Sequence, residues 1–455
     1  MTAMGRSAAE ERLLDAALAE VFGRPLAAAT SAWSAQRARW LAAALVLLGV
    51  AAVLGALLAR VPTAPAPVQE PEELPLPLQQ TARDLAELQR MPATTQNIAV
   101  QFWPVPEAEL LRLRAVRKLT IVRISATEQD SDVQTLAPLC RLPALTDLEL
   151  DTGVPWSLEP LRGCAQLRSL LICYRQLSAV EAERLVAIPR LRELRLRSVD
   201  LDLGFVRGLA PMPLEHFVAH WCFGFDAEAQ RALASIRSLR SFEILTAPPG
   251  QVPGKHPEPL DRDAFAAICA LPNLREVALR GTGHVPVGEL LDLLPLGLES
   301  LSVVDELSKS DVLGLRRLGH LRQLTLWQQR DDDAVAELVG ALRLRSFEGM
   351  VTPTTMTALA AQPDLLSVGI AWRSGLDLSL LPNLPALRRV VLFGPLLGSV
   401  QPGALGPPTE ALEPLRRCRQ LQSVRLVCRG LDAAAVQAVL REGIVVEIID
   451  DPRQL

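Results

Sequence analysis

Aromatic side chains are scarce in this chain of 455 residues: they make up 4% of it, although 49% of the residues are hydrophobic. Leucine, valine and alanine therefore supply most of the apolar surface, a composition typical of thin repeated layers. Lysine occurs only at Lys118, Lys255 and Lys309, whereas arginine is abundant, which is typical of the codon usage of a GC-rich bacterium. The net charge of −4 shows no overall basic excess, so the composition predicts no nucleic-acid partner.

Cysteine pairs with the spacing of metal ligands are absent. The seven cysteines form no C-x-x-C pair and their number is odd, so neither a zinc site nor a disulfide framework is predicted, and we expect buried thiols. His216, His220 and Cys222 resemble a ligand set. The frame described below, however, puts the two histidines on one strand, roughly 13 Å apart, and one metal ion could not bind both.

Sequence motifs of enzymes are also missing. The chain has no G-x-S-x-G turn, H-E-x-x-H pair, Walker loop or kinase signature. We therefore expect no catalytic residues and no cofactor, and a binding role in place of an enzymatic one.

One long uncharged apolar run stands near the N-terminus, WLAAALVLLGVAAVLGALLA at residues 40–59. As a helix it would span about 30 Å, the thickness of a bilayer's hydrocarbon core. Arginines precede the run, and acidic residues follow it from Glu70 onward. The positive-inside rule therefore predicts a single-pass anchor with a cytoplasmic N-terminus and an extracytoplasmic remainder. The run and the region before it are too long for a cleaved signal peptide.

Two different segments flank this run. Residues 1–39 form a predicted cytoplasmic tail with a short amphipathic helix in EERLLDAALAEVFG, which could either dock a partner or lie on the bilayer surface. Residues 60–79 contain six prolines between Pro62 and Pro77, which predicts an extended linker.

A six-residue frame, L-x-x-L-x-L, recurs through residues 80–455, mostly at steps of 21 to 25 residues. Clear copies include LTDLEL from Leu145, LRELRL from Leu191 and LRQLTL from Leu321, and degenerate copies begin at Thr95 and Gly443. We expect about 13–15 repeats. Two longer steps contain segments rich in proline and glycine, which predict insertions near residues 246–262 and 393–410.

At these positions the chain resembles the leucine-rich repeat superfamily. The resemblance implies an α/β solenoid in which each repeat adds one parallel strand to a concave sheet and a short helix to the convex face. The asparagine that usually follows the frame is mostly absent, and the helical segments are similar to the helix-bearing and cysteine-containing repeats of bacterial proteins.

Local patterns predict where several of these helices begin. Ser178 with Glu181 fits a capping box, and Asp226 and Thr352 are expected N-caps. The three consecutive carboxylates of residues 331–333 could suggest a cation site. A helix start is the simpler interpretation, because acidic residues there stabilise the helix dipole.

The residue after each frame predicts a row of side chains on the concave face. The row is apolar in its second half, and with the residue that follows Ala371 it gives these candidate partner-binding residues: Val304, Trp327, Met350, Ala371, Trp372 and Phe393. At about 4.8 Å between strands the row spans roughly 20 Å, a size typical of an interaction site with aromatic anchors. Alternatively, the second insertion or another copy of the chain covers the row, or a frame shift of one residue turns it inward.

These expectations combine into a membrane-anchored, non-catalytic scaffold that binds a protein or peptide on its concave face. Two alternatives stay open. One is a self-associating structural component of the envelope, and hence a homo-oligomer. The other is a cytoplasmic adaptor, which requires the reverse topology.

Overall fold

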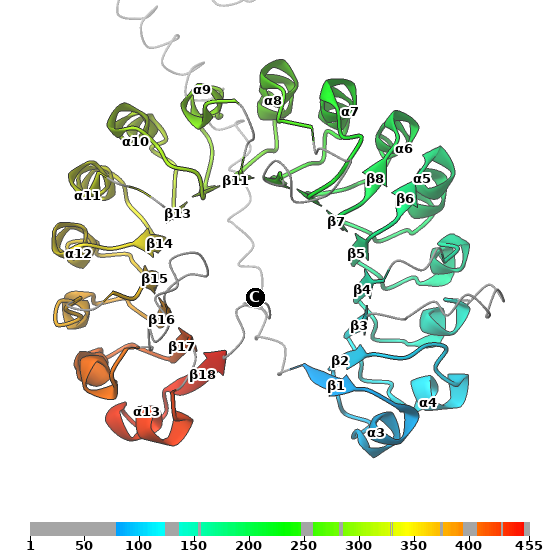
Figure 1. Cartoon of the computed structure of the whole chain (residues 1–455), viewed down its shortest axis with the longest axis horizontal. Coiled ribbons are helices and arrows are strands. Elements are labelled where there is room, and N and C mark those ends of the chain that lie inside the picture. Colours follow the sequence, from blue (N-terminus) through cyan, green and yellow to red (C-terminus); the bar gives the residue numbers. More distant parts are fainter. Residues whose placement is uncertain are drawn as a thin grey trace, which may run out of the picture. The chain divides into compact units, whose positions relative to one another are not determined.

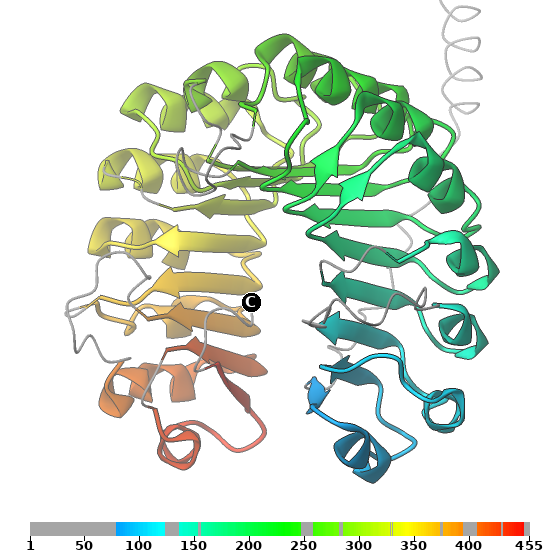
Figure 2. The same ribbon diagram turned by 45° about the vertical axis from the view of Figure 1, so that its right-hand side comes forward.

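The repeats form a curved solenoid with strands inside and helices outside (Figures 1 and 2). The structure is a computed structural model that describes residues 79–122, 136–152, 156–246, 258–281, 285–327, 329, 331–373, 376–394, 407–428 and 431–449. The predicted tail, membrane segment and all but the last residue of the linker lie outside these ranges, as does most of both predicted insertions. No helix within the ranges is long and apolar enough to span a bilayer. The chain divides after Pro75, and every described element belongs to the unit that begins at Leu76.

One parallel sheet of sixteen strands lines the inner face of the described solenoid. Fifteen of the strands coincide with the predicted frames, and β1, which precedes the first frame, was not predicted. The strands are β1 Gln80–Ala82, β2 Asn97–Val100, β3 Lys118–Val122, β4 Asp147–Asp151, β5 Ser169–Cys173, β7 Glu193–Arg197, β9 His216–His220, β10 Ser241–Leu245, β11 Glu276–Arg280, β12 Ser300–Val303, β13 Gln323–Leu326, β14 Ser346–Met350, β15 Ser367–Ala371, β16 Arg389–Phe393, β17 Ser423–Val427 and β18 Val445–Ile449. A separate parallel pair consists of β6 Gln176–Leu177 and β8 Asp200–Leu201.

Short helices form the outer layer. The α-helices are α3 Leu85–Arg90, α4 Glu107–Arg112, α5 Ala179–Val186, α6 Leu203–Gly208, α7 Ala227–Ala232, α8 Arg262–Cys269, α9 Val287–Leu291, α10 Lys309–Gly314, α11 Asp332–Ala341, α12 Pro353–Ala360 and α13 Ala433–Val439. The 3₁₀ helices are η1 Ala137–Arg141, η2 Glu159–Gly163, η3 Leu233–Ser235, η4 Leu315–Arg317, η5 Leu381–Asn383 and η6 Thr409–Arg417. The predicted helix starts at Ser178, Asp226, Asp331 and Thr352 are confirmed.

The frame leucines form a continuous core between sheet and helices. Leu321, Leu324 and Leu326 are at most 1% exposed. On β14, Phe347 is fully buried whereas its neighbour Glu348 is partly exposed. This alternation means that the frame is in the predicted register, because a shift by one residue would exchange the two faces.

A backbone ladder joins neighbouring turns at the second position of the frame. Here each residue donates its N–H to the carbonyl of its counterpart in the preceding repeat: Arg192 donates to Arg168, and Arg345 to Arg322, at 2.8 and 2.7 Å. The same bond recurs from Arg117, which donates to Gln96, to Gln422, which donates to Arg388. Backbone groups therefore hold neighbouring turns together at the N-terminal ends of the strands.

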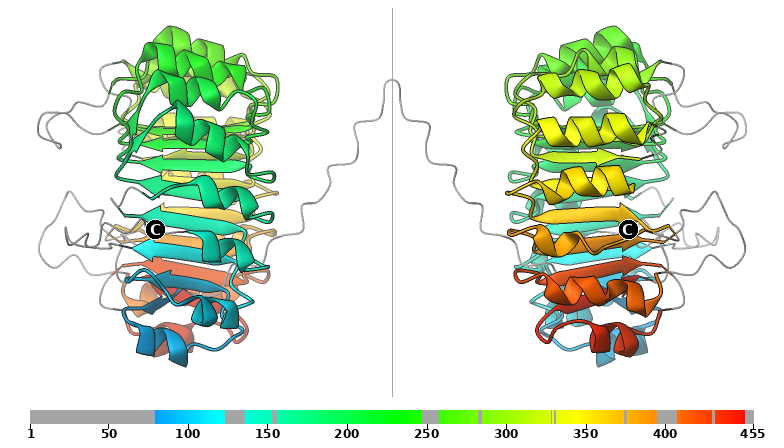
Figure 3. Two further views of the ribbon diagram at one scale, coloured as in Figure 1. Left: turned by 90° about the vertical axis from the view of Figure 1, so that its right-hand side faces the viewer. Right: turned by 90° about the vertical axis from the view of Figure 1, so that its left-hand side faces the viewer.

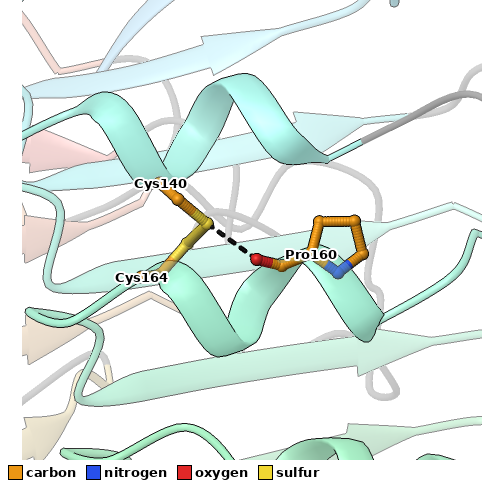
Figure 4. Close-up of a disulfide and its surroundings, with 3 residues drawn as sticks. All are labelled: Cys140, Pro160 and Cys164. Atoms are coloured by element: carbon orange, nitrogen blue, oxygen red, sulfur yellow. Dashed lines mark hydrogen bonds between the residues drawn. A yellow bond between two sulfur atoms is a disulfide. The ribbon is translucent and has the colours of Figure 1, made fainter.

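The expectation that the cysteines form no disulfide is wrong for one pair. Cys140 on η1 is disulfide-bonded to Cys164, which follows η2, with their Cα atoms 4.2 Å apart (Figure 4). The Cys140 sulfur also lies 3.0 Å from the carbonyl oxygen of Pro160. The separation of 24 residues is close to one repeat step, so the two cysteines lie on neighbouring turns. The other five cysteines are buried thiols outside any disulfide, as predicted.

Candidate binding site on the concave face

The predicted row of side chains lies in register across the second half of the sheet. Met350 pairs with Ala371, Ala371 with Phe393, and Phe393 with Val427. Trp327 directly follows β13 and donates its backbone N–H to the carbonyl of Val303 at 3.0 Å. The sheet therefore brings these side chains to one end of neighbouring strands.

Trp327 is covered by its own chain. Its ring meets that of Phe393 edge to face, with centroids 5.0 Å apart and planes at 87°, and it is only 8% exposed. The two rings reach each other across the strands between them because β15 carries small residues there. A Cβ added to Gly369 would lie 2.7 Å from Cγ of Glu348 and 3.2 Å from the Phe393 ring. We refer to Trp327, Glu348 and Phe393 as the aromatic cluster.

Glu348 is the polar member of the aromatic cluster. Burial raises the pKa of its carboxyl group, against the opposing attraction of Arg280 and a hydrogen bond from Trp327. The indole N–H is the only donor on the Trp327 side chain, so the carboxylate accepts it. This bond and the ring contact fix Trp327 from two sides.

The other candidates differ in how accessible they are. Val304, Met350 and Phe393 are partly exposed, whereas Ala371 is 8% exposed. Trp372 is 8% exposed and belongs to the leucine core. Its side chain therefore does not extend the row as the sequence suggested, because successive strand residues point to opposite faces. Trp327 is also too buried to act as an exposed anchor, and its ring instead packs against that of Phe393.

The first half of the concave face carries ion pairs in place of apolar side chains. Glu149 lies 2.9 Å from Lys118 and 3.1 Å from Arg195 and accepts a hydrogen bond from Thr120. Burial alone would raise the pKa of Glu149, but the two cations and the hydrogen bonds hold it below its usual value. This carboxylate is thus charged and held in place at neutral pH.

A second ion cluster follows toward the middle of the sheet. Glu243 lies 2.9 Å from His220 and 3.2 Å from Arg280. The hydrogen bond with His220 and the positive charge of Arg280 hold the pKa of Glu243 below its usual value in spite of its burial. The sequence analysis did not identify Glu243 as the centre of such a cluster.

The described residues contain no group of three or more His, Cys, Asp or Glu side chains that could hold a metal ion. His216 and His220 stand at opposite ends of β9, as the frame predicted. What the concave face offers is a surface that carries ion pairs over β3–β11 and a single apolar row at the C-terminal ends of β12–β17.

We expect Glu348→Gln to stabilise the solenoid at neutral and higher pH. Burial raises the pKa of Glu348 in the folded protein above its value in the unfolded chain. At a pH between these two pKa values, the folded protein binds more protons than the unfolded chain, so its stability falls as the pH rises through this range. Glutamine keeps an acceptor for Trp327 but does not titrate. Urea unfolding from pH 4 to 8 should show a flatter pH dependence for the variant.

The substitution Glu276→Gln, on the exposed edge of β11, is the control for loss of a surface carboxylate. If Glu348→Gln is the less stable protein at pH 8, the attraction between Glu348 and Arg280 outweighs burial, and our account of the aromatic cluster is wrong.

Comparisons with known proteins find a likeness only among solved structures. No family model and no curated protein matches the chain. An internalin from Listeria monocytogenes matches 73% of this chain and 80% of its own, at 15% sequence identity and a TM-score of 0.29. A complex of TLR13 with ssRNA13 matches 76% of this chain and 51% of its own, at 15% identity and a TM-score of 0.37. This chain thus spans about half the length of the TLR13 chain.

These likenesses are too distant to carry an argument, so the fold is identified from the repeats themselves. Each repeat adds one parallel strand to the inner sheet, buries the leucines of its frame and returns along the outer face, in most cases through a short helix. The chain therefore has the fold of the leucine-rich repeat superfamily.

Proposed function

We propose that this protein is a membrane-anchored, non-catalytic scaffold that binds a protein or peptide on the concave face of its solenoid. The observation that carries the proposal is the apolar row on that face, where Phe393 is partly exposed and packs against the Trp327 ring. An aromatic side chain already held in one position loses little conformational freedom on binding, which favours affinity.

The charged half of the face supports the same role. Charges arranged in mixed clusters contribute more to specificity and orientation than to affinity. A partner with apolar anchors at one end and a mixed-charge segment at the other is complementary to this surface.

The proposed location rests on two further observations. The apolar run at residues 40–59 has the length of a membrane span, and its flanking charges favour an extracytoplasmic solenoid. The Cys140–Cys164 disulfide agrees with that side of the membrane, because disulfides persist in oxidising compartments and are rare in the cytosol.

We expect Phe393→Asp to abolish partner binding without unfolding the protein. Aromatic anchors at the centre of an interface contribute about 2 kcal/mol or more each, so the affinity should fall by at least about thirtyfold. The measurement is retention of a distinct protein from envelope extract by immobilised residues 76–455, wild type against variant. The affinity for the purified partner then gives the magnitude.

A matched control is Val180→Asp. Val180 is 51% exposed on α5, on the outer face, and this variant should retain the partner. Loss of binding in both variants would contradict a concave site. Self-association of the wild type alone, lost in Phe393→Asp, would favour the structural role over the receptor role.

A further inference from the structure

One edge of the solenoid carries a row of arginines at the second position of the frame. We call this set the arginine row: Arg117, Thr146, Arg168, Arg192, Glu215, Arg240, Arg275, Glu299, Arg322, Arg345, Leu366, Arg388 and Gln422. Eight arginines against two glutamates give the row a net charge of +6, whereas the whole chain has a net charge of −4. Positive charge is therefore concentrated along this edge.

The backbone ladder fixes the spacing of the row. Each member after Arg117 donates its N–H to the carbonyl of the one before it, at 2.7–2.9 Å, so the side chains follow one another at the distance between strands. At about 4.8 Å per strand, the row extends roughly 60 Å along the arc. The strands run side by side, so their N-terminal ends gather on one side of the solenoid (Figure 3).

Several arginines of the row have no partner among the described residues. Arg117, Arg168, Arg345 and Arg388 are exposed, and no side-chain hydrogen bond or ion pair joins them to the described part of the chain. Others have a structural role, as Arg322 does when it donates to the carbonyl of Arg343 at 3.2 Å. The first group is thus available to a ligand.

The adjoining positions do not cancel this charge. The first residue of each strand lies beside the row, and there two basic side chains stand against three acidic ones, namely Lys118 and Arg389 against Asp147, Glu193 and Glu276. The edge as a whole keeps a net charge of +5. A shallow pocket of about 300 Å³, lined by Glu215, Ser238, Arg240, Asn273 and Arg275, opens on the same edge.

Apolar side chains are exposed on this edge as well. Leu296, in the turn before β12, is 63% exposed, and Val445, the first residue of β18, is 66% exposed. Val445 donates its N–H to the carbonyl of Gln422, the last member of the row, at 2.9 Å. Arginines combined with exposed aliphatic side chains are typical of a surface that lies on a bilayer interface. A nucleic acid would favour stacking aromatic rings instead.

We propose that the arginine row rests on an anionic phospholipid surface, so that the solenoid stands on its edge at the membrane with its concave face open to the side. Each arginine near such a surface strengthens membrane binding roughly fivefold. The row binds lipid phosphates as a set of separate charges and requires no single headgroup site.

The test is sedimentation of residues 76–455 with vesicles at about 0.15 M salt. This part of the chain suffices because all of the described core lies within it. The wild type should bind vesicles that contain phosphatidylglycerol and not vesicles of phosphatidylcholine alone. The combined substitution of Arg117, Arg168, Arg345 and Arg388 by glutamine should weaken binding by about a hundredfold or more.

A second combined variant removes the same charge elsewhere. It replaces Arg207, Arg231, Arg262 and Arg316 by glutamine, all on the outer helices, and should bind like the wild type. Three results would overturn the inference: no binding by the wild type, equal loss in both variants, or binding of single-stranded RNA but not of vesicles. Since the anchor is missing from this fragment, failure here leaves the proposed anchor intact. That proposal is tested separately, by whether the full chain resists alkaline extraction from membranes.

Discussion

Replacing Phe347 by alanine is expected to lower the free energy of unfolding by about 3 to 5 kcal/mol. Phe347 is the second residue of β14, fully buried, one residue before Glu348 and on the opposite face. The loss combines the transfer free energy of the ring with the cavity left between sheet and helices, which a closely packed solenoid cannot fill. Urea denaturation followed by circular dichroism measures it.

The comparison with Phe393→Ala makes this result informative about register. Phe393 lies on the concave face and is partly exposed, so its loss should cost only about 1 kcal/mol, chiefly the contact with Trp327. If Phe393→Ala proves the more damaging of the two, the faces of the sheet are exchanged and the concave row is not a surface.

Removing the disulfide is the second change with a large expected effect. The double substitution Cys140→Ser and Cys164→Ser should lower stability by about 3 kcal/mol, because the bond closes a loop of roughly one repeat and restricts the unfolded chain. Thermal unfolding with and without dithiothreitol measures the effect. Reductant should lower the melting temperature of the wild type but leave that of the double variant unchanged.

Thiol counting provides an independent check. The chain has seven cysteines, so alkylation of the denatured, unreduced protein should modify five. Modification of all seven in protein recovered from its native membrane would contradict the disulfide, and with it one support for an extracytoplasmic solenoid.

The strands could be predicted because their signal is local and repeated. Leu321, Leu324 and Leu326 mark a strand through spacing alone, and fourteen more copies of the frame agree with them. Helix starts were equally clear, since an N-cap such as Asp226 bonds a backbone N–H only three residues away, that of Ala229. Patterns of this kind need no knowledge of distant contacts.

Contacts between repeats were harder to predict. Trp327 and Phe393 are 66 residues apart in the sequence, and their meeting depends on the space that Gly369 leaves between them. The one sequence feature that could have indicated this contact is the pair of small residues on β15, Gly369 and Ala371, which stand between strands with larger side chains. The leucine frame itself does not reveal such a gap, because its leucines face the core and the gap lies on the opposite, concave face of the sheet.

Trp372 and the disulfide were missed for related reasons. An apolar residue next to an apolar row cannot be assigned to either face by its type, and only alternation along β15 places Trp372 in the core. Cys140 and Cys164 occupy different positions within their repeats. Whether the two cysteines meet depends on how the two neighbouring turns stack on each other, which only the three-dimensional structure shows.

The most direct test of the central claim is photo-crosslinking in intact cells. The full chain would carry a benzophenone amino acid in place of Phe393, or in place of Val180 on the outer face as the control. The account predicts an adduct with a distinct second protein from position 393 and none from position 180. Adducts from position 180 alone, or adducts at 393 that contain only this chain, would contradict a concave receptor site.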